Sequence, residues 1–221
     1  MKTMKRDGDR AAYHLVAPVY EWIEACYSGG AISACKRAQT AYFREGEHVL
    51  FAGAGTAPEA LLAAQAGARV TLLDRSEAML AMARTHFRKA GFPDPFCWHG
   101  DLASYAPGVT HDVVVANFFL NVFLKDELAP VLAQLNALRK PGGRLLIGDF
   151  APFRGSGPCL WLQKLYWFWP LLIANQITGE PIHPIYTYQP ALEQAGLTVQ
   201  ACFYFRPLGF GPAWYQLLIA V

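Results

Sequence analysis

The sequence predicts an α/β protein whose core is a doubly wound, mostly parallel sheet. Short apolar runs alternate with helical patterns between residues 48 and 150, the order that a parallel sheet with right-handed crossover connections requires. Of the 221 residues, 53% are hydrophobic and 16% are charged, and we find no linker that would divide the chain. This composition supports one sizeable core and argues against disorder. We therefore expect a single domain over residues 1–221.

The segment 48–67 has the pattern of a strand, a tight turn and a helix. Its apolar run at 49–51 suits a buried parallel strand. Gly53 and Gly55 follow, and glycine allows positive φ at positions where a side chain would block a ligand. Pro58 suits the first turn of the helix, because its missing N–H would be unpaired there. This stretch predicts the start of a ligand site.

Polar side chains follow the next three expected strands. These three strands are expected at 69–74, 96–99 and 112–117, and a fourth is expected at 144–150. Asp74 lies about twenty residues beyond the glycines, a distance that suits a carboxylate binding ribose hydroxyls. Asp101 follows the second strand, and Asn117 ends the third. Because ligands of doubly wound sheets lie outside the carboxyl ends of the strands, these residues should converge with the glycine turn.

Helical patterns fill the remaining chain up to the last of these strands. Residues 10–43 have apolar side chains at helical spacing and should lie over the domain as a lid. Further helices are expected at 59–66, 77–90 and 125–140, the last with basic residues in its final turn and a Pro-Gly-Gly stop behind it.

Charge and cysteine usage argue against several classes of protein. A formal net charge of +2 gives no sign of the strongly basic surface that binds nucleic acid. The five cysteines form no CxxC pair and no apolar leader precedes them, so we expect reduced thiols in a cytoplasmic protein. The apolar run 165–174 is too short to span a bilayer and contains a proline. No cluster has metal-ligand spacing, so no metal is expected.

Over residues 45–221 the chain resembles a class I S-adenosylmethionine-dependent methyltransferase. The turn at 52–57 is similar to the family's glycine loop, which passes the methionine part of the cofactor, although Ala57 replaces the third glycine. Residues 138–147 resemble the family's helix-to-strand junction, and 200–221 resemble its closing strand pair. The resemblance implies a Rossmann-like, seven-stranded, mostly parallel sheet with a closing antiparallel strand. It also implies S-adenosylmethionine as cofactor.

The resemblance assigns roles to individual residues. Asp74 would hold both ribose hydroxyls, Asp101 would meet the adenine amino group, and Leu102 would flank the adenine ring. Asn117 and Phe118 would face the methyl sulfonium. The predicted cofactor-binding residues are Tyr20, Gly53, Ala54, Gly55, Asp74, Arg75, Asp101, Leu102, Asn117 and Phe118.

The segment 13–20 resembles the opening of ubiquinone/menaquinone-type methyltransferases. There the second tyrosine approaches the cofactor carboxylate, a role that falls to Tyr20, while His14 replaces the first acid. The resemblance divides the chain into a helical lid (1–44), a cofactor-binding core (45–150), an acceptor cap (151–197) and a closing strand pair (198–221).

The predicted cap holds many of the chain's aromatic residues. Flat rings stack on planar apolar ligands, so we expect a small hydrophobic acceptor, aromatic or quinone-like, with Trp161, Tyr186 and Tyr188 as contacts. The same rings could pack on the sheet, touch a membrane surface or form a homodimer, and these alternatives stay open. A general base is optional, and His183 and His14 are the candidates.

Rival functions differ in chemistry. A nicotinamide dehydrogenase would need a third glycine where Pro58 stands, and the closing strand pair argues against it. A non-catalytic module that binds S-adenosylmethionine, and an enzyme of this fold that uses the cofactor for chemistry other than methyl transfer, are the alternatives that stay open.

Overall fold

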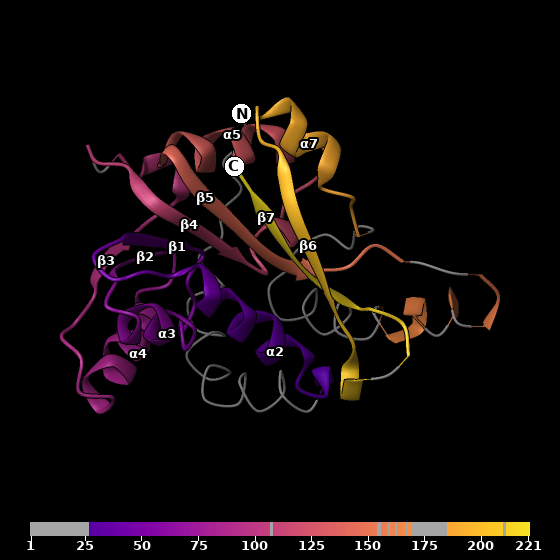
Figure 1. Ribbon diagram of the computed structural model, residues 1–221, viewed down its shortest axis with the longest axis horizontal. Coiled ribbons are helices and arrows are strands. Elements are labelled where there is room, and N and C mark those ends of the chain that lie inside the picture. The colour runs from indigo at the N-terminus through magenta and orange to yellow at the C-terminus, as the bar shows by residue number, and fades with distance from the viewer. Residues whose placement is uncertain are drawn as a thin grey trace.

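The computed structural model describes residues 27–106, 108–153, 156–158, 160–161, 163–166, 168, 185–209 and 211–221. Within them lies a seven-stranded sheet with the order β3-β2-β1-β4-β5-β7-β6 (Figure 1). Its strands are β1 (His48–Ala52), β2 (Arg69–Asp74), β3 (Phe96–His99), β4 (His111–Asn117), β5 (Arg139–Phe150), β6 (Val199–Phe205) and β7 (Tyr215–Ala220).

Strand direction confirms the predicted fold class. The pairings among β1 to β5 are parallel, whereas β7 runs antiparallel to both of its neighbours, β5 and β6. The closing strand is therefore β7, inserted between β5 and the edge strand β6. Residues 1–26, which are most of the predicted lid, and residues 169–184, in the middle of the predicted cap, lie outside the described residues. The division into lid, core and cap therefore stays a prediction.

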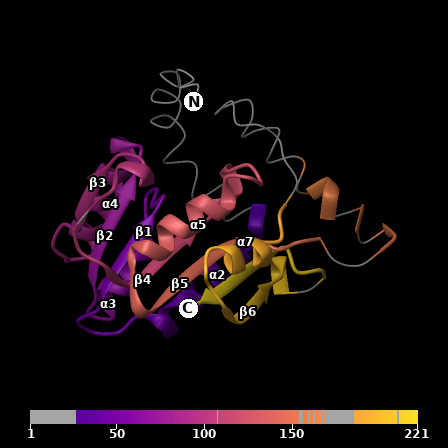
Figure 2. The same cartoon turned by 90° about the horizontal axis from the view of Figure 1, so that it is seen from above.

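Helices cover both faces of the sheet (Figures 1 and 2). They are α2 (Ala31–Ala38), α3 (Ala60–Gln65), α4 (Glu77–Lys89), α5 (Leu128–Ala137) and α7 (Gln189–Gln194), with short 3-10 turns η1 (Gln39–Tyr42), η2 (Leu102–Ser104), η3 (Leu120–Val122) and η4 (Pro207–Gly209). Because side chains alternate along a strand, Phe51 packs in the core under α2, α3 and α4, and Leu50 packs in the core under α5 and α7. Both cores bury large aliphatic side chains, which anchors the strand ends.

The helix predicted at 125–140 ends earlier than its sequence pattern suggested. α5 stops at Ala137, and the next residues already belong to β5. The reason is a competing strand pairing: His111 N–H donates to the Leu138 carbonyl at 2.8 Å, and His111 pairs with Arg139 across the sheet. The predicted stop at 141–143 therefore lies inside β5, near a shift in its register with β4.

Helix α7 was not expected as a separate element within the predicted cap. Its Leu192 is fully buried in the core that also contains the apolar side of α5. The carboxyl end of the predicted cap thus packs on the sheet rather than standing away from it. No helix among the described residues is both long and apolar enough to cross a bilayer.

Candidate functional site

The predicted site residues meet at one edge because the strands that carry them end in register. Ala52 pairs with Leu73 on one side and with Ala116 on the other. Asp74, the next residue along β2, pairs with His99 of β3. The segments that follow β1, β2, β3 and β4 therefore lie at the carboxyl edge of the sheet, where doubly wound folds bind ligands.

Asp74 is tied to the glycine turn. Gly55 N–H donates to its Oδ2 at 2.7 Å and Ser76 N–H donates to its Oδ1 at 2.8 Å. Burial raises the pKa of Asp74, and the N–H groups oppose that rise. Three backbone N–H groups, of Gly55, Ser76 and Arg75, donate to the carboxylate, which has about four lone-pair sites and so can still accept from a ligand hydroxyl. Such an acceptor fits a ribose.

The two glycines of the turn serve different purposes. Gly55 has a φ of +56°, and a Cβ built on it would meet no atom of the described residues within 4 Å, so these residues leave space for a ligand there. A Cβ on Gly53 would instead lie 2.3 Å from Cδ2 of Phe119. The residue that requires Gly53 in this structure is therefore Phe119, which sequence reasoning did not assign to the site. Ala57, at the third glycine position, adopts a φ of 48° and is buried.

Asn117 is held in a polar network. Its Oδ1 accepts from Gln39 Nε2 at 2.6 Å, and its Nδ2 donates to Glu59 Oε1 at 2.9 Å. Gln39 and Glu59 are buried, and their side chains come from η1 and from the residue that caps α3. With both ends of its amide engaged, Asn117 fixes the end of β4. The partners were missed because they lie far away in sequence.

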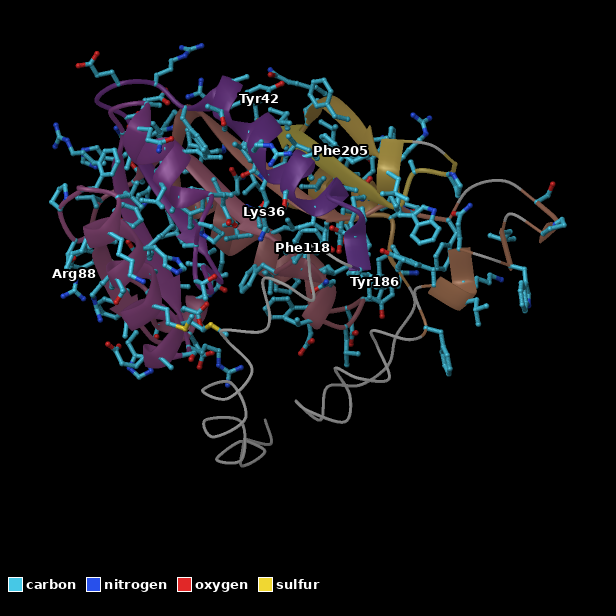
Figure 3. All side chains as sticks on the ribbon, turned by 90° about the horizontal axis from the view of Figure 1, so that it is seen from below. Lys36, Tyr42, Arg88, Phe118, Tyr186 and Phe205 are labelled. Carbon is cyan, nitrogen blue, oxygen red and sulfur yellow. The ribbon has the colours of Figure 1, made fainter. Side chains whose placement is uncertain are left out.

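A cation joins this network from α2. Lys36 Nζ lies 3.6 Å from Glu59 Oε2, an oxygen for which the described residues provide no hydrogen-bond partner. The same ammonium stands 6.0 Å from the centre of the Phe118 ring. Figure 3 labels both residues. Phe118 itself has a φ of 50°, a conformation rare for a bulky residue and typical of functional sites. The network thus surrounds a strained residue at the end of β4.

The predicted adenine contacts lie after β3. Asp101 Oδ1 forms an ion pair with Arg75 Nε at 2.9 Å, and both side chains are exposed. Leu102 is buried in η2. The structure therefore places Arg75, Asp101 and Leu102 together beside the end of β2.

An aromatic cluster lies next to Phe118. The rings of Phe118, Phe150 and Tyr215 pack with centroid separations of 5.5–5.9 Å. Tyr166 extends the cluster, because its hydroxyl lies 3.0 Å from that of Tyr215, and its ring contacts Trp214. The indole Nε1 of Trp214 is buried, and the described part of the chain offers it no hydrogen-bond partner. Of these residues only Phe118 was predicted for the site.

Asp149 is a further buried acid that sequence reasoning missed. It is 0% exposed, and its carboxylate accepts from Tyr188 Oη at 2.8 Å and from Phe150 N–H at 2.7 Å. Burial raises the pKa of Asp149 to about 7, against the effect of these donors. An acidic residue within an apolar strand was the available sequence signal.

The predicted acceptor contacts are separated in the structure. Tyr188 is 2% exposed and its hydroxyl is committed to Asp149, Tyr186 is partly buried against the core of α5 and α7, and Trp161 is 63% exposed. Their acceptor role stays a prediction. Tyr20, His14 and His183 lie outside the described residues.

Residues 49–143 match the family model described as a methyltransferase domain. This range contains the glycine turn, Asp74, Asp101 and the end of β4. This match and the relatives described below support a class I S-adenosylmethionine-dependent methyltransferase. The resemblance inferred from the sequence is thereby confirmed.

Similar proteins agree with this assignment. A ubiquinone/menaquinone biosynthesis C-methyltransferase of Paracoccus denitrificans is 28% identical over 169 residues, which cover 74% of this methyltransferase and 67% of the relative. The solved mitomycin 7-O-methyltransferase has a TM-score of 0.63 at 20% identity and covers 86% of this chain, which spans only 53% of that structure. Magnesium protoporphyrin IX methyltransferase from Synechocystis PCC 6803, solved with S-adenosylhomocysteine, has a TM-score of 0.59 at 19% identity over 100% of this chain and 89% of its own. These structures show the fold.

S-adenosylmethionine is the cofactor of this methyltransferase. The described residues fit it: the free space above Gly55 and the acceptor sites left on Asp74 suit the ribose and the chain beside it. Arg75, Asp101 and Leu102 stay predicted contacts of the cofactor.

Proposed function

We propose that this methyltransferase transfers a methyl group to a small hydrophobic acceptor, aromatic or quinone-like. The observation that carries the proposal is the aromatic cluster of Phe118, Phe150, Tyr215, Tyr166 and Trp214 at the carboxyl edge of the sheet. Aromatic walls favour planar apolar ligands, with ring stacking worth about 0.5–1.5 kcal/mol beyond burial. The cluster begins at Phe118, so an acceptor there would lie next to the cofactor site.

The comparisons support the same class of acceptor. The relative from Paracoccus denitrificans is named for ubiquinone/menaquinone biosynthesis, and the solved structures are named for mitomycin and magnesium protoporphyrin IX. Trp161, Tyr186 and Tyr188 remain proposed acceptor contacts, which requires that an acceptor also reach the predicted cap.

The chemistry divides between the cofactor and the chain. S-adenosylmethionine supplies an electrophilic methyl group when bound. Asp74 and the backbone of Gly55 hold its ribose side, and the Gln39–Asn117–Glu59 network fixes the end of β4 beside it. The aromatic cluster excludes water and orients the acceptor, which is the main requirement for transfer in line.

Proton removal is needed only if the acceptor is a phenol, a thiol or an acidic carbon. His183 and His14 are the proposed bases, since histidine titrates near neutrality. Asp149 holds a proton in the same range of pH, because burial raises its pKa to about 7, but it contacts Tyr188 rather than the open edge of the site. We further propose a cytoplasmic location and, for the assembly, a homodimer.

A methylation screen tests the function. Purified protein and S-adenosylmethionine are incubated with naphthoquinols, phenols, aromatic amines and aromatic thiols, and with sugars and amino acids of similar size, while released S-adenosylhomocysteine is measured. We expect turnover with ring compounds and none with the polar set. Turnover of the polar set alone would contradict the apolar acceptor. Binding of S-adenosylhomocysteine with no turnover on any compound would favour the non-catalytic alternative.

A further inference from the structure

An outward-facing apolar stripe lies on the segment 158–168, which is helical wherever the structure describes it. Trp161, Leu165 and Phe168 are 63%, 40% and 44% exposed. Residues spaced by four and by three share one face of a helix. The opposite face turns inward: Gln163 is buried, and the Tyr166 ring stacks on Tyr27 with centroids 4.1 Å apart. This helix therefore presents its large apolar side chains to solvent.

A second apolar residue is exposed nearby. Leu208, in the turn between β6 and β7, is 72% exposed and has a φ of 53°. A branched residue held in this conformation is strained, and such strain persists where function requires it. Leu208 N–H donates to the Gly29 carbonyl at 3.3 Å, and Gly29 is close in sequence to Tyr27, the stacking partner of Tyr166. The turn and the helix are thus linked through residues 27–29.

Both elements lie at the same end of the molecule. Figures 1 and 2 show the gold turn after β6 and the orange helical segments on the side away from β3. We call the exposed side chains of Trp161, Leu165, Phe168 and Leu208 the apolar end. Large exposed apolar groups gathered in this way mark an interaction surface.

The charged residues around the apolar end indicate which kind of partner fits it. Lys164 and Arg206 are exposed beside it. The sequence contains no acidic residue from 150 to 179 or from 194 to 221, and its basic residues there are Arg154, Lys164 and Arg206. Exposed apolar side chains on segments that carry basic and no acidic residues are complementary to an anionic lipid surface, where aromatic rings enter the headgroup boundary and cations attract the lipid charge.

We propose that the apolar end docks on an anionic phospholipid bilayer. The helix lies flat on the surface with Trp161, Leu165 and Phe168 in the headgroup region, and Leu208 enters beside them. Tryptophan prefers this depth, because its ring is apolar and its N–H stays hydrated. The proposal concerns a surface outside the aromatic cluster, and it gives Trp161, which is 63% exposed, a lipid contact in place of the acceptor contact expected from the sequence.

Sedimentation with vesicles tests the proposal. The full chain is mixed with vesicles of equimolar phosphatidylcholine and phosphatidylglycerol, and with vesicles of phosphatidylcholine alone. We expect binding to the anionic vesicles, and a loss of roughly tenfold or more in the double variant Trp161→Ser/Phe168→Ser. Phe96→Ser is the matched control, because Phe96 is 61% exposed but lies on β3 at the other end of the sheet. It should bind like the unchanged protein.

A second variant separates charge from apolar contact. Lys164→Gln/Arg206→Gln should weaken binding to the anionic vesicles and reduce its sensitivity to salt. Titration with S-adenosylhomocysteine shows that each variant keeps the cofactor site, independently of methyl transfer.

Three results would overturn the proposal. One is the absence of vesicle binding by the unchanged protein, and another is an equal loss in Phe96→Ser. The third is self-association, detected by light scattering, that Trp161→Ser/Phe168→Ser abolishes while vesicle binding is unaffected. That result would assign the apolar end to a second copy of the chain.

Discussion

The backbone N–H of Gly55 donates to the Asp74 carboxylate at 2.7 Å. The turn after β1 and the end of β2 are thereby locked to each other before any ligand binds. Ser76, which starts the helix after β2, donates to the other carboxylate oxygen at 2.8 Å. Asp74 therefore both organises the glycine turn and keeps acceptor sites for a ribose, so its two roles can be separated by substitution.

Asp74→Asn should weaken S-adenosylhomocysteine binding by about 100-fold, because each hydrogen bond to a charged group contributes about 1.5–3 kcal/mol and the amide accepts through one oxygen only. Calorimetric titration measures the affinity, and circular dichroism checks the fold. Asp94→Asn is a suitable control, since Asp94 is an exposed acid paired with Arg88 before β3. Equal affinities for Asp74→Asn and the unchanged protein would remove Asp74 from the site.

The two glycines of the turn should respond differently to alanine. Gly53→Ala brings a Cβ to 2.3 Å from Phe119 Cδ2, and such overpacking costs about 1–3 kcal/mol of unfolding free energy beyond the backbone strain. Gly55→Ala meets no atom, so only the left-handed backbone cost of about 1–2 kcal/mol applies, while the methyl group enters the cofactor space and weakens binding.

Urea unfolding and titration with S-adenosylhomocysteine measure both effects. Gly46→Ala reports the backbone cost alone, since Gly46 has a φ of +79° and open space around it. Should Gly53→Ala unfold like Gly46→Ala, the Phe119 contact would carry no energetic weight.

Sequence reasoning placed the strands and their polar ends because these depend on local patterns and on parallel topology. Gly55, Asp74 and Asp101 reach one edge through strand register alone. The partners of Asn117 could not be foreseen, because Gln39 and Glu59 are 78 and 58 residues away, and only the packing of α2 and α3 brings them together. Tyr188 was assigned to the acceptor from its aromatic neighbours, yet the structure directs its hydroxyl to Asp149.

Asp149 should make stability depend on pH. Burial raises its folded-state pKa to about 7 from a usual value of 3.8, so the folded state binds the proton more tightly. The stabilisation is complete below the unfolded pKa and is lost as pH rises to about 7, with a slope of up to about 1.4 kcal/mol per pH unit. Asp149→Asn cannot titrate and should flatten the unfolding free energy between about pH 4 and about pH 7.

Urea unfolding at a series of pH values compares the two proteins. Tyr188→Phe removes a donor that lowers the pKa of Asp149, so the folded-state pKa of Asp149 should rise in this variant. The stability of the variant should therefore keep falling to a higher pH than that of the unchanged protein. Parallel curves for the unchanged protein and Asp149→Asn would show that another group controls the dependence.

Lys36 and Glu59 form an ion pair whose side chains are 15% and 5% exposed. Glu59→Leu removes a carboxylate next to the Lys36 ammonium and one of the two acceptors of the Asn117 amide, so we expect a loss of about 3–5 kcal/mol. Lys36→Met/Glu59→Leu should lose less than the sum of its single variants, because it removes both charges. Urea unfolding of the four proteins gives the coupling energy.

The exposed Arg88–Asp94 pair is the matched control, for which the coupling should stay below about 1 kcal/mol. A coupling no larger for the buried pair would mean that Glu59 is not the main partner of Lys36.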